Sequence, residues 1–228
     1  MRISETFSSI QGEGQWLGVP SIFLRLSGCN LRCSWCDTPY ASWNAEGRET
    51  TMEELLTEFK KWPNVKHLVI TGGEPFIFPE LPEWVSHFKD LGYVITIETA
   101  GTIWRATQAD LISISPKLKN STPDCHEHPK ISQRHEKSRI NLEALANFIQ
   151  QHNSQLKFVL EENDGLTEVY ELLESLPTIA KENIYLMPQT QDKDYSKVMQ
   201  SLIDIAMENG FRVTPRLQIA IWGNKRAT

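Results

Sequence analysis

The sequence has no apolar run approaching the roughly 18 residues that a membrane-spanning helix needs. Its first residues, MRISETFSSIQGEG, also lack the basic and then apolar order of a secretory signal. We therefore expect no membrane partner and a cytoplasmic location. An excess of positive charge is missing as well, since 23 Lys and Arg stand against 29 Asp and Glu, a net charge of −6. Nonspecific nucleic-acid binding needs a basic face, so no nucleic-acid partner is expected.

Cysteine is scarce, with four residues in the chain of 228. Three of them, Cys29, Cys33 and Cys36, lie in the short stretch GCNLRCSWCDTPY, and Cys125 is far away in the sequence. In a reducing compartment, clustered cysteines indicate metal binding or catalysis more often than disulfides. A disulfide within this stretch would also close only a very small, strained loop. The stretch therefore predicts a metal or catalytic site.

Apart from these features the composition is ordinary, with 40% hydrophobic and 23% charged residues, which fits a globular protein with a sizeable core. Apolar segments alternate with helical patterns along the chain. Strands are expected at 21–27, 66–73, 93–101, 110–117, 155–160, 183–189 and 211–223, and helices at 50–62, 79–92, 141–152, 165–176 and 195–210. Residues 117–138 are polar, contain two prolines and show no periodicity, so a loop or insertion is expected there.

Repeated strand–helix units predict right-handed crossovers and a largely parallel sheet. Six or seven strands are too few for a closed eightfold barrel. We expect an α/β fold, a partial, open β/α barrel of about six parallel strands in one domain (1–228), with a doubly wound open sheet as the alternative. In both folds functional residues gather at the carboxyl ends of the strands. The cysteine stretch and the segments TGGEP, ETAGT, SISPK and MPQ all follow predicted strands.

Thiolates are soft ligands that select zinc, copper(I) or iron–sulfur clusters. Structural zinc normally takes four ligands, but this stretch supplies three. A [4Fe–4S] cluster held by three cysteines leaves one iron open for another ligand. Two alternatives remain: an electron-transfer cluster, or a zinc site completed by Cys125, His126 or His128.

The spacing Cys-x₃-Cys-x₂-Cys, followed by TGGEP at 71–75, resembles the radical S-adenosylmethionine (SAM) superfamily. The resemblance implies that Cys29, Cys33 and Cys36 bind a [4Fe–4S] cluster with SAM on its open iron. An electron from the cluster would cleave SAM, and the 5′-deoxyadenosyl radical would take hydrogen from the substrate. No side chain is therefore expected to act as the catalytic group.

The same resemblance implies SAM contacts in the cysteine stretch and at strand ends. Trp35 is expected against the adenine, and the exposed backbone of the glycines against the methionine part of SAM. The expected SAM-binding residues are Trp35, Cys36, Asp37, Gly72, Gly73, Glu74, Glu98, Ser115, Pro116, Lys117 and Gln189.

The stretch from SSIQGEG through the cysteines, together with IETAGT, SISPKLK and the terminal WGNKRAT, resembles the 7-carboxy-7-deazaguanine synthase family. This resemblance implies a lyase of queuosine and 7-deazapurine biosynthesis. The reaction would contract 6-carboxy-5,6,7,8-tetrahydropterin to 7-carboxy-7-deazaguanine with release of ammonia, and SAM would be regenerated. The resemblance also implies Mg²⁺, a homodimer and an electron donor of flavodoxin or ferredoxin type.

Several residues fit a pterin substrate. Arg25 alternates with Leu24 and Leu26 in its strand, and an inward Arg paired with the substrate carboxylate avoids an unpaired buried charge. A solvated Arg on the outer face is the alternative. Family positions implicated in substrate binding are Ile10, Gln11, Gly12, Glu13, Arg25, Thr71 and, in a tail folded over the pocket, Thr228.

Thr38 matches the magnesium ligand of the family, although Asp37 is the residue that ligand chemistry alone would favour. Two other functions remain open at this point. A glycyl-radical activating enzyme shares the cysteine spacing, but IQGEG and WGNKR weigh against it. A non-catalytic zinc or cluster module that binds a partner is the third reading.

Overall fold

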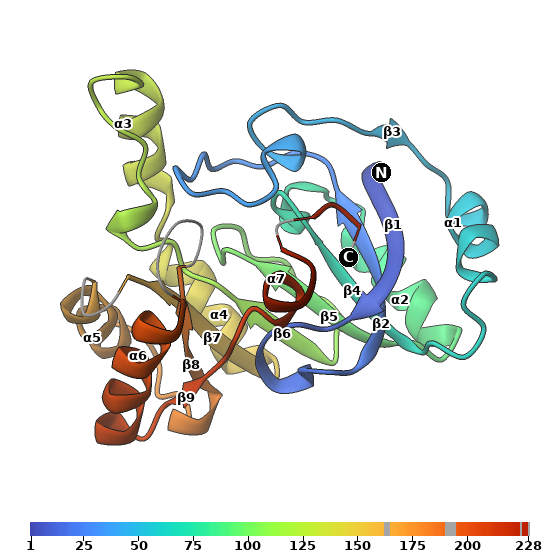
Figure 1. The fold of residues 1–228 in the computed structure, drawn as a ribbon. Coiled ribbons are helices and arrows are strands. Elements are labelled where there is room, and N and C mark those ends of the chain that lie inside the picture. Colours follow the sequence, from blue (N-terminus) through green and yellow to red (C-terminus); the bar gives the residue numbers. More distant parts are fainter. Residues whose placement is uncertain (162–164, 190–194, 224, 228) are drawn as a thin grey trace.

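The computed structural model describes residues 1–161, 165–189, 195–223 and 225–227. Within this part of the chain, nine strands form one sheet in the order β3-β1-β2-β4-β5-β6-β7-β8-β9, with helices around it (Figure 1). The strands are β1 (Arg2–Ile10), β2 (Pro20–Leu26), β3 (Arg48–Glu49), β4 (His67–Gly72), β5 (Val94–Thr99), β6 (Leu111–Ile114), β7 (Ser154–Leu160), β8 (Ile184–Pro188) and β9 (Arg212–Val213). The pairs from β2 through β9 are all parallel, whereas β1 and β3 are antiparallel. The prediction of an open β/α barrel with about six parallel strands is confirmed.

Seven α-helices are found in the described residues: α1 (Met52–Phe59), α2 (Leu81–Asp90), α3 (Pro129–Ser138), α4 (Leu142–Gln151), α5 (Leu166–Glu174), α6 (Tyr195–Asn209) and α7 (Leu217–Trp222). Five 3₁₀ turns accompany them: η1 (Gly14–Trp16), η2 (Pro39–Ala41), η3 (Pro75–Ile77), η4 (Lys119–Ser121) and η5 (Lys181–Asn183). Helix α1 begins with a capping box, in which Thr51 and Glu54 satisfy each other's backbone N–H groups. In the described part of the chain, no helix combines the length and apolar character needed to cross a membrane.

The two faces of the parallel strands have different surroundings. In β2, Ile22 and Leu24 are fully buried in the core between sheet and helices. Phe23 and Arg25, which alternate with them, face a cavity on the inner side of the sheet. The same alternation in β7 turns the charged Lys157 inward. The fold therefore turns alternate residues of β2 and β7 toward one cavity.

Three segments differ from the predictions. Residues 2–10 form β1, which was not predicted because RISETFSSI lacks a clean apolar alternation. The predicted strand at 211–223 stops after Val213, since Pro215 has no N–H to continue the ladder, and α7 follows. Within 117–138, where a loop or insertion is expected, residues 129–138 form the helix α3. That helix projects from the body (Figure 1) and buries only Ser132 and His135, so its sequence shows no apolar stripe.

A β-bulge interrupts the pairing of β1 with β2. Ile3 lies opposite Leu26, but Glu5 lies opposite Arg25, so Ser4 is an extra residue in β1. In a regular strand Glu5 would share the face of Ile3, which is buried in the helix-side core. The bulge instead turns Glu5 to the face of Arg25.

Candidate active site

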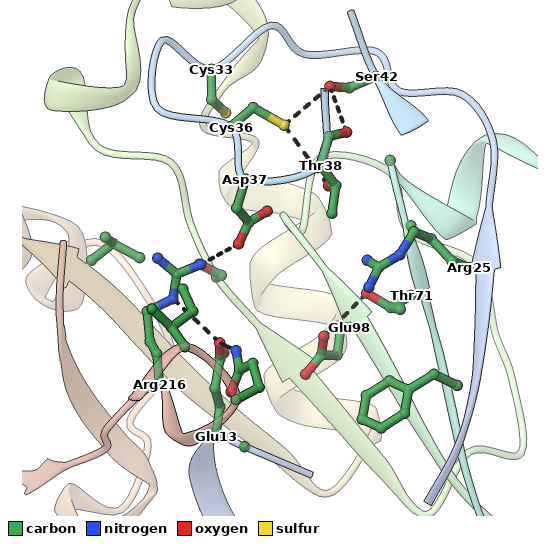
Figure 2. A pocket seen from close by; sticks show the side chains of 18 of the residues that line it. Glu13, Arg25, Cys33, Cys36, Asp37, Thr38, Ser42, Thr71, Glu98 and Arg216 are labelled. Carbon is green, nitrogen blue, oxygen red and sulfur yellow. Dashed lines mark hydrogen bonds and ion pairs between the residues drawn. The ribbon is translucent and has the colours of Figure 1, made fainter. Parts of the chain in front are cut away.

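A cavity of about 430 Å³ lies at the carboxyl ends of the parallel strands, a volume typical of small-molecule sites. Its walls are the cysteine loop (residues 28–42), the inward side chains of the strands, and residues of the C-terminal segment 216–227. Figure 2 shows Cys33, Cys36 and Thr38 on one side of this space and Glu13 on the other. The predicted residues Ile10, Gln11, Gly12, Thr71, Gly72 and Gly73 also line it.

The three clustered cysteines line this cavity together. Cys36 Sγ lies 3.1 Å from Ser42 Oγ and 3.9 Å from Thr38 Oγ1. Burial, helped by the carboxylate of Glu74, raises the pKa of Cys29 to about 12, and burial raises the pKa of Cys33 to about 11. A metal that binds these thiolates must therefore displace their protons.

The segment 117–138 holds the cysteine loop from outside. Ser34 N donates to Ser121 O at 2.9 Å, and Trp35 Nε1 donates to Asn120 O at 2.9 Å. Arg32 N donates to Nδ1 of His135 at 3.2 Å. These bonds fix the backbone on both sides of Cys33.

His135 has no vacant ring nitrogen for a metal. Because Nδ1 accepts from Arg32 N, the proton is on Nε2, which donates to Ser121 Oγ at 2.9 Å. Burial lowers the pKa of His135 to about 4, so the ring is neutral near pH 7. The imidazole therefore connects α3 to the loop.

The strand-end sequence TGGEP brings its backbone close to the cysteine loop. Gly73 N donates to Leu26 O at 3.1 Å, and Glu74 N donates to Gly28 O at 2.9 Å. The side chain of Glu74 is fully buried and does not line the cavity, and its expected contact with SAM stays a prediction. Its carboxylate instead accepts from Phe76 N, Thr99 Oγ1 and Ala100 N. Burial raises the pKa of Glu74 despite these donors.

A buried charged group lies opposite the cysteines. Lys157 Nζ is 2.7 Å from Glu13 Oε2 and 3.3 Å from Glu98 Oε1. Gln11 Nε2 donates to the same Glu98 oxygen at 3.2 Å. Burial acts to raise the pKa of Glu13, but the charges of Lys157 and Arg216 outweigh it and lower the pKa to about 2. The two carboxylates likewise raise the pKa of Lys157 against the effect of its burial. Glu13 and Lys157 are therefore both ionised near pH 7.

Asp37 and Thr38 differ in their availability for a metal ion. Asp37 forms an ion pair with Arg216, whose guanidinium is buried beside Glu13 (Figure 2). Thr38 lines the cavity and, among the described residues, its hydroxyl contacts Cys36 Sγ and no carboxylate.

Some of the remaining predicted SAM-binding residues line the cavity and others do not. Lys117 Nζ donates to Ser115 Oγ at 2.8 Å and lies 5.5 Å from the centre of the Trp35 ring, and all three residues line the cavity. Pro116 and Gln189 do not line it, so the structure does not bring them to the site. Gln189 follows β8 but is buried.

Arg25 faces the cavity and has a partner within the protein. The sequence argument, that only the substrate carboxylate could balance its charge, is therefore corrected. Its Nε donates to Glu5 Oε1 at 2.7 Å. The guanidinium carbon lies 5.8 Å from the centre of the Phe7 ring, which stacks on Phe23. The side-chain Nη groups are on the cavity side of this pair, directed toward Thr71 (Figure 2).

The C-terminal segment covers part of the site. Gly223, Lys225, Arg226 and Ala227 line the cavity, as expected for a tail folded over it. The expected contact of Thr228 lies outside the described residues.

Sequence reasoning missed the cavity residues Lys157 and Arg216 and, behind the cavity wall, Glu5. A signal existed for Lys157, since a charged residue in the apolar run QLKFVL must face an enclosed polar site. Arg216 and Glu5 gave no such signal, because each lies beside an irregularity: Pro215 and the bulge at Ser4.

The donor set fits a cluster better than a single metal ion. Ligands of one ion converge on a point, whereas each cysteine of a cluster binds a different iron. Over the described ranges, no three His, Cys, Asp or Glu side chains converge in that way. Cys125, His126 and His128 are exposed and do not line the cavity, so they supply no fourth zinc ligand.

Comparisons with known proteins agree with this geometry. Residues 24–150 match the family described as the radical SAM superfamily. The chain is 42% identical over 228 residues to a 7-carboxy-7-deazaguanine synthase of Rhodopirellula baltica, covering 99% of this chain and 88% of the relative. It is 36% identical to a 7-carboxy-7-deazaguanine synthase of Halobacterium salinarum, with 99% and 92% covered. The crystal structure of QueE from Escherichia coli is similar, with a TM-score of 0.75, 25% identity, and 94% and 92% covered. The chain therefore belongs to the radical SAM superfamily and, within it, to the 7-carboxy-7-deazaguanine synthase family.

Proposed function

We propose that this protein contracts 6-carboxy-5,6,7,8-tetrahydropterin to 7-carboxy-7-deazaguanine with release of ammonia. The observation that carries the proposal is one cavity with three cysteines on one side and a set of ionised and amide side chains on the other. Full-length similarity to 7-carboxy-7-deazaguanine synthases supports the same reaction. The enzyme is thus a radical SAM lyase of 7-deazapurine biosynthesis.

The cysteine side of the cavity suits the cofactors. When bound, a [4Fe–4S] cluster on Cys29, Cys33 and Cys36 together with SAM supplies the 5′-deoxyadenosyl radical. In our proposal, Lys117 holds the Trp35 ring in place from above, so that the ring can pack on the adenine. In our proposal the methionine part of SAM contacts the backbone of Gly72 and Gly73, which line the cavity.

The opposite side suits the pterin. Gln11, Glu13 and Thr71 present amide, carboxylate and hydroxyl groups that match the donors and acceptors of a pterin edge. Lys157 keeps the carboxylate of Glu13 ionised, and its ion pairs hold Glu13 and Glu98 in place. The Nη groups of Arg25 bind the substrate carboxylate in a bidentate pair in this proposal.

Mg²⁺ is proposed at Thr38. The hydroxyl faces the cavity, and substrate oxygens and water would have to complete the coordination. Asp37 is the less suitable ligand, because Arg216 already pairs with it. Thr38→Ala should raise the Mg²⁺ concentration needed for half-maximal turnover, while Thr38→Ser should restore the wild-type value. An unchanged requirement in Thr38→Ala would remove this residue from the site.

The decisive assay combines anaerobic, cluster-loaded protein with a reductant, SAM, Mg²⁺ and the carboxytetrahydropterin. We expect 7-carboxy-7-deazaguanine and ammonia in equal amounts and no net consumption of SAM. Cluster-loaded protein that cleaves SAM but forms no deazaguanine would refute the proposed substrate. Zinc without sulfide in the purified protein would instead favour a binding module, which the donor geometry already disfavours.

The reaction needs a one-electron reductant, and we propose a flavodoxin or ferredoxin as the donor. We also propose that the protein forms a homodimer and that it is located in the cytoplasm. These three proposals depend on the family resemblance. Four free thiols in the structure suit a reducing compartment. Sedimentation of the cluster-loaded protein tests the dimer, and a mass of about 26.1 kDa would contradict it.

A further inference from the structure

The carboxylate of Glu5 connects four parts of the molecule. Its Oε1 accepts from Arg25 Nε in β2 at 2.7 Å and from Tyr40 OH in the cysteine loop at 2.9 Å. Its Oε2 accepts from Arg226 Nε in the C-terminal segment at 3.1 Å. The Glu5 side chain is only 10% exposed. A buried carboxylate with three donors from separate elements is a fixed point of the structure.

The β-bulge at Ser4 is what places Glu5 there. Without the extra residue, the carboxylate would point with Ile3 into the apolar core, where its charge could not be satisfied. With the bulge, Glu5 lies directly opposite Arg25 on the neighbouring strand. Bulges often re-aim side chains next to active sites, which suggests that this pairing serves the site.

The contact to Glu5 uses only one end of the Arg25 guanidinium. Nε is bonded to Glu5, and the Phe7 ring lies 5.8 Å from the guanidinium carbon, so both the plane and the rotation of the group are restricted. Within the described residues, the Nη atoms of Arg25 have no protein acceptor at hydrogen-bond distance. Arg25 lines the cavity, whereas Glu5 does not. Glu5 therefore contacts Arg25 from the side that faces away from the cavity.

We propose that Glu5 is the positioning residue that aims the Nη groups of Arg25 at the carboxylate of the substrate. This inference rests on the proposed function, because it assumes a carboxylated pterin. A guanidinium held at Nε in a fixed plane loses little freedom when it forms a bidentate pair. Glu5 thereby makes the enzyme selective for substrates that carry the carboxylate.

The same carboxylate ties the C-terminal segment to this arrangement. Arg226 stacks on the Tyr40 ring, 4.0 Å from its centre, and also pairs with the exposed Glu46 at 3.0 Å. Glu46 does not contact Arg25, so Glu46→Gln weakens the hold on the tail without releasing Arg25. It is the matched control for Glu5→Gln, since both changes remove one carboxylate that pairs with Arg226.

The test compares two ligands in cluster-loaded wild type, Glu5→Gln, Glu46→Gln, Arg25→Met and the double variant Glu5→Gln/Arg25→Met. The ligands are carboxytetrahydropterin and the tetrahydropterin without the carboxyl group. Glutamine keeps one neutral oxygen, which accepts more weakly from the Arg25 guanidinium than a carboxylate does, and its amide NH₂ cannot accept from Arg226, so the hold on Arg25 should weaken. Iron content, sulfide content and melting temperature show whether each variant is folded and loaded.

We expect Glu5→Gln to raise the KM and Kd of the carboxylated pterin about tenfold, with kcat changed far less and binding of the decarboxylated pterin unchanged. In the double variant, Glu5→Gln should add nothing to Arg25→Met. Glu46→Gln should leave the preference for the carboxylated ligand intact. If Glu5→Gln is unstable, Glu5→Asp must show the same ligand-selective loss, because the shorter side chain retracts from Nε.

Three results overturn the inference: unchanged affinity in Glu5→Gln, tighter binding, or equal weakening of both ligands. A loss in Glu5→Gln that adds fully to that of Arg25→Met also contradicts it. Failure of the proposed function looks different, since the wild-type protein would then show neither turnover nor a preference for the carboxylated pterin.

Discussion

Replacement of Gly73 by alanine should detach the cluster without touching a cysteine. A β-carbon on residue 73 would lie 1.9 Å from Gly28 O and 2.7 Å from Ala41 O, both backbone atoms of the cysteine loop. Gly73 does not have a positive φ, so alanine is allowed there by its backbone conformation. The effect of the substitution therefore comes from this contact alone.

The size of the displacement follows from the distances. Since β-carbons essentially never approach other atoms within 3.0 Å, the contact of 1.9 Å must open by at least 1.1 Å. A shift of this size along the bond from Glu74 N to Gly28 O would lengthen it from 2.9 Å to about 4 Å and break it. Overpacking costs about 1–3 kcal/mol and each lost hydrogen bond about 1 kcal/mol, a total of about 2–4 kcal/mol. Cys29 directly follows Gly28 and must move with it.

The measurement is the iron and sulfide content of anaerobically reconstituted Gly73→Ala, together with its visible absorbance and 5′-deoxyadenosine formation. We expect most of the cluster and of SAM cleavage to be lost. Gly92→Ala is the control, because Gly92 has φ +81° but no atom within 4 Å of an added β-carbon. It should lose about 1 kcal/mol of stability and keep its cluster. A fully loaded, SAM-cleaving Gly73→Ala protein would refute the argument.

Three further predictions concern the two sides of the cavity. Lys157→Met should cost about 3–5 kcal/mol in urea unfolding of cluster-free protein at pH 7. The pKa of Glu13 is lowered from 4.5 to about 2, so the stabilisation that its ionised form provides is complete above pH 4.5 and is lost as the pH falls toward 2. The loss of unfolding free energy caused by Lys157→Met should therefore be about 2 kcal/mol smaller at pH 3 than at pH 7. The same loss at both pH values would contradict the pairing of Lys157 with Glu13. Arg25→Lys should raise the KM of the pterin about tenfold and leave SAM binding unchanged, whereas equal effects on both would argue against a carboxylate contact. Cys33→Ala should lose the cluster and Cys125→Ala should keep it, as iron analysis will show.

The order of strands and helices could be predicted from the sequence because the two faces of the parallel strands differ in polarity. One face is apolar against the helices, and the other ends in the polar motifs of the site. Residues such as Thr71, Glu98 and Ser115 could be placed from sequence for this reason, since the carboxyl ends of parallel strands meet at one edge. Whether each of them contacts SAM or substrate is a separate question, and it remains a prediction.

The ion pairs could not be predicted from the sequence, because the paired residues lie far apart in it. Lys157 meets Glu13 across 144 residues, and Arg216 meets Asp37 across 179. Glu74 is the reverse case: its place in a family motif predicts a ligand contact, and the structure adds that its fully buried carboxylate has three donors from its own chain. A motif therefore predicts the position of a residue in the fold, whereas its burial and its hydrogen-bond donors show which groups it contacts.

The open barrel gives the C-terminal segment its importance. In a closed barrel the strands themselves surround the site, but here β3 and β9 end the sheet and leave one side without a wall. Residues of the C-terminal segment line the cavity on that side, and Leu217 N donates to Gly12 O at 3.1 Å to hold α7 against the first loop. Arg226 then reaches Glu5 in β1. The last residues of the described chain thus contact the first strand, so the pocket is complete only when the whole chain has folded.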